Sequence, residues 1–171
     1  MLRANKGFHD VLEREHPYIF IDACMQAWPD TDYAVAHRHG ATCYSVTACG
    51  VFQDLDEALE NVMSYHLAVS RHATVRIART AADIRAAKAD GVAALVLHAQ
   101  GGEWVAGKLH RLAAFKELGL RMMLPAYNRS NQLCGGCLEP HDGGLTSLGR
   151  AFVAEANRLG IVLDGSHVGY R

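Results

Sequence analysis

Four segments of the sequence carry side chains that could bind a metal ion or a small polar ligand. In the first, Cys134 and Cys137 are separated by two glycines, and His141 follows four residues later. Two thiols at this spacing occur in zinc sites and in redox-active pairs. A zinc site needs a second ligand pair, and a redox pair normally opens a helix, whereas this pair lies in a glycine-rich stretch. We therefore favour a structural loop, with metal binding or redox chemistry as the alternative.

The other three segments each follow an apolar run. His167 ends the sequence Asp164-Gly-Ser-His and could be a metal ligand, a general base or a partly exposed loop histidine. Gln100 precedes two glycines, which favour either close approach of the backbone to a ligand or a simple tight turn. The polar cluster 128–131 could bind a carboxylate through the planar donor fork of Arg129, or form an asparagine-rich turn. The remaining histidines with no ligand spacing are expected at the surface or packed: His37, His39, His66, His72, His98 and His110.

These polar segments lie at the ends of predicted strands. Short apolar or β-branched runs predict strands over residues 18–22, 41–48, 75–78, 92–97, 121–124 and 161–164. Helical periodicity and glycine stops predict helices over residues 55–70, 81–89, 107–118 and 146–159. Thr80 and Asp83 form a variant of the capping box before the second of these helices. The alternation predicts an α/β fold with a parallel sheet or barrel, whose ligand sites form at the carboxyl ends of the strands.

Composition narrows the range of partners. Seventeen Lys and Arg residues against 18 Asp and Glu give a net charge of −1, which excludes a strong electrostatic footprint for nucleic acid or an anionic membrane. Five cysteines without a disulfide framework favour a reducing compartment. No apolar run is long enough to span a bilayer, and residues 1–17 lack the apolar centre of a signal peptide. We therefore expect one domain over residues 1–171 in a cytoplasmic protein.

The second half of the chain resembles a known family. Its segments HAQGG, KELGLRMMLPAYNRSN and GGLTSLGRAFVAEANRLGIVLDGSHVGYR are similar to the membrane, or renal, dipeptidase family of zinc peptidases. The similarity extends more weakly to ARTAADIRAAKADG and to FIDA. This resemblance implies a (β/α)8 TIM-type barrel with a two-zinc centre that hydrolyses dipeptides and related amides.

Carrying the family's metal site over to this chain gives an altered set of ligands. His167 matches a histidine zinc ligand, but Cys24 and Gln26 occupy the family's His-x-Asp positions. Gln100 lies where the bridging carboxylate belongs, and Tyr127 replaces a substrate-contacting histidine. Because two close cations need negatively charged ligands, we expect at most one zinc ion. The resemblance then implies His167, Cys24 and Gln100 as metal ligands and Tyr127, Asn128 and Arg129 as substrate-binding residues, with no catalytic residue assigned.

The length of the chain limits these expectations. A barrel of this kind takes about 250 residues, so 171 residues correspond to an incomplete barrel of roughly the first five β/α units. We expect either a fragment of a longer protein or a truncated relative, with its open edges covered by a second copy or by a missing C-terminal portion. The main hypothesis is a divergent metallo-dipeptidase acting on a small-molecule dipeptide or amide, weak or inactive as this chain alone. The alternatives are a catalytically inactive binding or assembly module, and a small Cys-x-x-Cys metal or redox protein.

Overall fold

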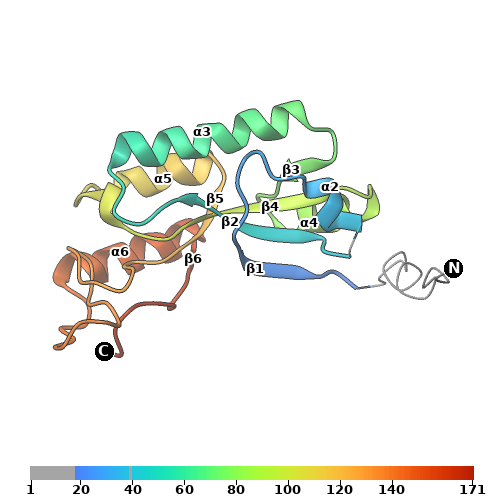
Figure 1. The fold of residues 1–171 in the computed structure, drawn as a ribbon. Coiled ribbons are helices and arrows are strands. Elements are labelled where there is room, and N and C mark those ends of the chain that lie inside the picture. The colour runs from blue at the N-terminus through green and yellow to red at the C-terminus, as the bar shows by residue number, and fades with distance from the viewer. Residues whose placement is uncertain (1–17, 39) are drawn as a thin grey trace, which may run out of the picture.

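The structure, a computed structural model, describes residues 18–38 and 40–171, and its strands form one curved parallel sheet (Figure 1). The strands are β1 (Ile21–Met25), β2 (Cys43–Cys49), β3 (Val75–Ile77), β4 (Ala93–Ala99), β5 (Leu120–Met123) and β6 (Val162–Leu163). Their order is β1-β2-β4-β5-β6, with the short β3 also paired to β4, and each pairing is parallel. Parallel neighbours connected through helices make an incomplete TIM-type barrel, as the sequence predicted.

Helices cover the sheet and share its core with the strands. They are α2 (Tyr33–Arg38), α3 (Leu55–Arg71), α4 (Ala81–Ala89), α5 (His110–Glu117) and α6 (Ser147–Leu159), with a 3-10 turn at Glu103–Val105. The main core joins α3, α5 and α6 to β2 and β4 through buried side chains such as Val62, Phe115, Phe152, Val46 and Leu97. A smaller cluster packs α4 against the first residues of β2 and β4. The sheet is thereby held as one curved surface whose strand ends lie along one edge.

Local signals in the sequence placed the boundaries of α3, α4 and α6 to within one residue. The Thr80 side chain accepts from the Asp83 backbone, and the Asp83 carboxylate accepts from the Thr80 backbone, which is the predicted capping box. Asp54 and Glu57 form a second such box at the start of α3. Gly160 ends α6 in the left-handed region at φ 70°, where glycine has no steric penalty.

The first strand differs from its prediction. It begins at Ile21 rather than residue 18, and Phe20 and Ile21 are each 50% exposed instead of buried. The reason is topological, because among the described residues β1 is an edge strand that pairs with β2 alone. The short helix α2 was not predicted. The predicted helix over 107–118 begins only at His110, since Ala106 and Gly107 adopt positive φ angles of 46° and 72°.

Two predictions fall wholly or partly outside the described residues. These are the interpretation of residues 1–17 as lacking a signal peptide, and the placement of His39. Over the part of the chain that is described, no helix has the length and apolar character needed to cross a membrane.

Candidate functional site at the strand ends

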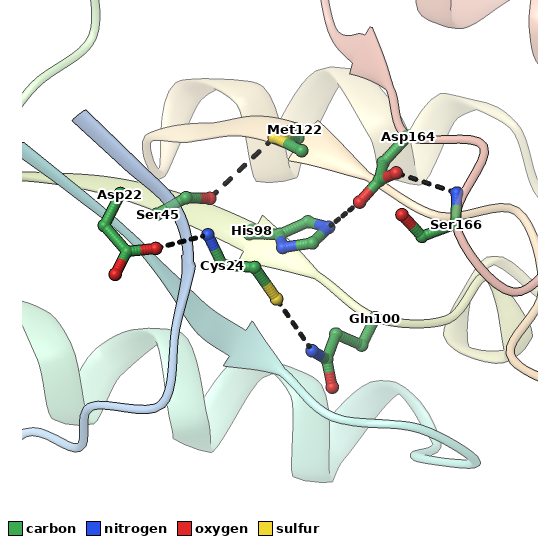
Figure 2. A network of polar contacts seen from close by, with 8 residues as sticks. All are labelled: Asp22, Cys24, Ser45, His98, Gln100, Met122, Asp164 and Ser166. Carbon is green, nitrogen blue, oxygen red and sulfur yellow. Dashed lines mark hydrogen bonds and ion pairs between the residues drawn. The ribbon is translucent and has the colours of Figure 1, made fainter.

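Polar side chains from several strands meet in one network (Figure 2). Asp22 and Cys24 come from β1, Ser45 from β2, His98 from β4 and Met122 from β5. Gln100 follows β4, and Asp164 and Ser166 follow β6. Because parallel strands end at the same edge of a sheet, residues more than 100 positions apart in sequence lie close together here.

Two predicted metal ligands are in contact. The Gln100 side-chain amide donates to Cys24 Sγ at 3.9 Å, and the Cys24 backbone N–H donates to Asp22 Oδ1 at 3.1 Å. The turn after Gln100 is tightly packed, since a Cβ on Gly102 would lie 2.8 Å from the Pro125 carbonyl oxygen. Gly102 therefore serves close backbone packing, whereas a Cβ on Gly101 would meet the Glu103 side chain. Cys24 and Gln100 supply one sulfur and one neutral amide, with no carboxylate in this contact.

A second contact lies deeper in the network and was missed by the sequence analysis. His98 is 1% exposed, and its Nε2 lies 3.7 Å from Asp164 Oδ2. Neither ring nitrogen has a hydrogen-bond partner among the described residues. Burial lowers the pKa of His98, and the nearby Asp164 carboxylate only partly opposes this shift.

A signal for His98 was present in the sequence. His98 lies two residues before Gln100, and alternate residues of a strand point to the same face. The Asp164 carboxylate also accepts from the Ser166 backbone N–H at 2.8 Å through Oδ1. Asp164 thus joins the His98 side chain to the turn that carries His167.

The third cluster brings together three more predicted residues. The His167 ring stacks on Tyr127, with ring centroids 4.0 Å apart and an interplanar angle of 21°. His167 Nδ1 lies 2.8 Å from Asn128 Oδ1. Arg129 is exposed, and its backbone N–H donates to the Tyr127 carbonyl at 2.7 Å. The described structure places no hydrogen bond or ion pair on the Arg129 side chain, so its predicted substrate role stays a prediction.

The Cys134-Gly-Gly-Cys137 segment packs as a loop beneath this cluster. All five cysteines are free; Cys134 is buried and Cys137 is exposed. Burial raises the pKa of Cys134 to about 11, which disfavours the thiolate that metal or redox chemistry requires. A Cβ on Gly136 would overlap the Asn128 carbonyl group. The favoured structural-loop interpretation agrees with this packing.

The donor set can be compared with the zinc centre that the resemblance implies. Gln100 is a neutral amide, and so is Gln26, which is exposed. Two adjacent zinc ions would lack the negative ligands that offset their repulsion, so the residues do not fit a two-ion centre. The described residues contain no group of three or more His, Cys, Asp or Glu side chains able to hold a metal. For a single ion, the Cys24 thiol and the His167 imidazole are suitable donor types.

Comparison with known proteins finds a matching family profile and a dipeptidase among the similar sequences. The family profile described as membrane dipeptidase (Peptidase family M19) matches residues 24–171. The chain is 34% identical over 74 residues to the dipeptidase aclJ of Aspergillus oryzae, a match covering 42% of this chain and 18% of that protein.

Two solved structures share the fold. An amidohydrolase from Pseudomonas aeruginosa is 30% identical with a TM-score of 0.84, covering 90% of this chain and 47% of that one. A metallopeptidase from Rhodobacter sphaeroides, liganded with a phosphinate mimic of L-Ala-D-Ala, is 22% identical with a TM-score of 0.72. That match covers 89% of this chain and 59% of the metallopeptidase. The chain thus spans less than two thirds of the length of each of these proteins.

Proposed function

Because the chain belongs to the membrane dipeptidase family, we propose that it is a metallo-dipeptidase-like hydrolase whose substrate is a dipeptide or a related small amide. The proposal is supported by two contact groups among the predicted site residues, one after β1 and β4 and the other around His167. Cys24 contacts Gln100, and His167 contacts Tyr127 and Asn128. These pairs are separated by 76, 40 and 39 positions in the sequence.

Zinc is the metal that we propose for this site, with at most one ion per chain. Cys24, Gln100 and His167 would hold it, since thiolate sulfur and imidazole nitrogen are preferred zinc donors. When bound, the ion would supply Lewis-acid polarisation of the substrate carbonyl. The loss of charge at Gln100 supports weaker zinc binding than in a centre with a bridging carboxylate.

The chain's own residues would bind and orient the substrate. The exposed guanidinium of Arg129 is a planar fork suited to a terminal carboxylate. Tyr127 and Asn128 precede it in sequence, and both contact His167. We propose that the peptide lies along these residues with its carboxylate toward Arg129.

One observation favours the alternative of a catalytically inactive binding or assembly module. The contact between Gln100 and Cys24 places a neutral amide where a bridging charge would be needed. A scaffold that has lost its metal chemistry could still bind a small peptide through Tyr127 and Arg129. We therefore keep peptide binding and peptide hydrolysis as separate, measurable properties.

We also propose that residues 1–171 form one domain that works in the cytoplasm. Five free cysteines, two of them exposed, suit a reducing compartment better than an oxidising one.

The experiment compares hydrolysis with binding on the same purified chain. Amino-acid release is measured for a panel of dipeptides, with D- and β-residues in the second position, at added zinc. Binding of the same dipeptides is measured by calorimetry. We expect release that Cys24→Ser and His167→Gln both reduce by at least tenfold. Binding without release would assign the chain to the inactive module, and neither binding nor release would reject both functions.

A further inference from the structure

We infer that Asn128 is a positioning residue that fixes the tautomer of His167, with the Cys137 thiol as its partner. The proposal rests on the proposed function in one respect, namely that the ligand of His167 is zinc. Asn128 Oδ1 lies 2.8 Å from His167 Nδ1 and 3.3 Å from Cys137 Sγ. One amide oxygen therefore faces two potential donors.

The contact with an amide oxygen decides where the imidazole proton lies. An amide oxygen has no hydrogen to give, so His167 Nδ1 must carry the proton and donate it. In the neutral ring, the lone pair is then on Nε2, which has no hydrogen-bond partner in the described part of the chain. A histidine binds zinc through its lone-pair nitrogen, while the other nitrogen donates to a supporting group. The contact with Asn128 therefore leaves the Nε2 lone pair available to a metal ion already in the metal-free protein.

Cys137 helps to determine which atom of the amide faces His167. A thiol is a weak donor, and its contact at 3.3 Å with the same atom favours the oxygen over the NH2 group. The two donors thus hold Asn128 in one orientation. This gives the exposed cysteine of the Cys-Gly-Gly-Cys segment a use that is neither metal binding nor redox chemistry.

Backbone hydrogen bonds also hold the same three residues together. The His167 carbonyl accepts from the backbone N–H groups of Asn128 at 3.2 Å and of Cys137 at 2.9 Å. Both Asn128 and His167 adopt left-handed backbone angles, with φ of 62° and 65°. Asparagine tolerates this region better than most residues. The His167 ring is also stacked on Tyr127, so its orientation is constrained from two sides.

The test reads the tautomer directly in the metal-free protein. Long-range ¹H–¹⁵N correlation spectra of the full ¹⁵N-labelled chain, recorded above the titration range of histidine, distinguish protonated from unprotonated ring nitrogens. The His167 signals are assigned by their loss in His167→Gln. We expect a protonated Nδ1 and an unprotonated Nε2. A protonated Nε2, or a mixture of the two tautomers, would overturn the proposal.

Two variants at one position provide the matched control. Asn128→Gly removes the acceptor and keeps the left-handed backbone without strain, so the tautomer should become mixed. Asn128→Asp keeps an acceptor oxygen, so the Nδ1–H form should persist. Cys137→Ser should also retain it, because a hydroxyl still donates. A tautomer unchanged in Asn128→Gly would reject the positioning role, and circular dichroism confirms that each variant is folded.

Zinc affinity separates this inference from the proposed function. If both hold, Asn128→Gly should weaken zinc binding by roughly 10–100-fold, while Asn128→Asp stays close to the unaltered chain. If the unaltered chain binds no zinc, the proposed metal site fails, and the tautomer measurement still decides the role of Asn128. Zinc binding that is equal in all three chains would overturn the link between Asn128 and the metal.

Discussion

At the scale of single residues, the resemblance implies a site with fewer negative charges than the family's zinc centre. Cys24 and Gln100 contact each other where the resemblance implies histidine and a bridging carboxylate. In the same network, the buried imidazole of His98 lies beside the Asp164 carboxylate. The chemistry open to this chain therefore depends on which negative charges remain near the strand ends.

A carboxylate in place of the Gln100 amide should strengthen metal binding. Gln100→Glu adds one negative charge next to Cys24, and carboxylate oxygen is a better ligand than an amide for divalent cations. We expect zinc affinity to rise at least tenfold, measured by competition with a chromophoric chelator. Gln53→Glu is the matched control, since it adds the same charge at a side chain that accepts from the Gly50 backbone. An equal rise in both variants would show a general charge effect and contradict the site.

His98 should make stability depend on pH. Burial lowers its pKa below the ordinary value of about 6.5, so between these two values the unfolded chain binds more protons than the folded one. The free energy of unfolding should therefore fall as pH drops through 6.5 and level off below the folded pKa. Urea denaturation at several pH values measures this slope. It should flatten in His98→Gln and persist in His72→Gln, an exposed histidine; a slope that survives in His98→Gln would contradict the assignment.

At the scale of elements, the sequence predicted the features that depend on short-range interactions and missed those that depend on contacts far apart in the chain. The boundaries of α3, α4 and α6 depend on caps within three or four residues, and periodicity and capping predicted them closely. The burial of β1 was predicted wrongly because it depends on whether a strand has one neighbour or two. The cluster of Asn128, Cys137 and His167 depends on a contact across 39 positions, which no local pattern encodes.

The cap of α4 offers a local test. Thr80→Ala removes the side-chain acceptor of the Asp83 backbone N–H and should cost about 1 kcal/mol of unfolding free energy. Thr80→Ser keeps the hydroxyl and should cost much less. Urea denaturation of both variants gives the difference, and equal stability of the two would show that the capping box contributes little.

Gly136 tests the loop that supports the His167 cluster. Gly136→Ala would push a Cβ into the Asn128 carbonyl, and overpacking of this kind costs about 1–3 kcal/mol. Gly143→Ala is the control in the same loop, because a Cβ there meets no atom within 4 Å. Denaturation midpoints should fall for Gly136→Ala and stay unchanged for Gly143→Ala. Comparable midpoints for the two variants would mean that the loop relaxes around the new methyl group.

At the scale of the whole molecule, the described part of the sheet ends in two edge strands, β1 and β6. Within the described residues β1 pairs only with β2 and β6 only with β5, and Ile21 and Val162 are 50% and 60% exposed. Unpaired strand edges with exposed apolar side chains favour association with another strand. The chain, which spans 47% of the length of its P. aeruginosa relative, should therefore self-associate at the β1 edge when studied alone.

Sedimentation velocity over a range of concentrations tests this expectation. Ile21→Lys places a charge on the edge strand and should shift the chain toward the monomer. Leu67→Lys is the control, because Leu67 is equally exposed but lies on α3. A monomer at all concentrations, or equal effects of the two substitutions, would contradict association through β1.

If the chain hydrolyses dipeptides with a single zinc ion, as proposed above, its activity must follow zinc occupancy. The most direct measurement is the initial rate of dipeptide hydrolysis as zinc is titrated into metal-free chain. We expect a rate that rises with zinc, reaches its plateau at one equivalent per chain and is lost in His167→Gln. A plateau at two equivalents, or no hydrolysis at any zinc concentration, would contradict the proposal.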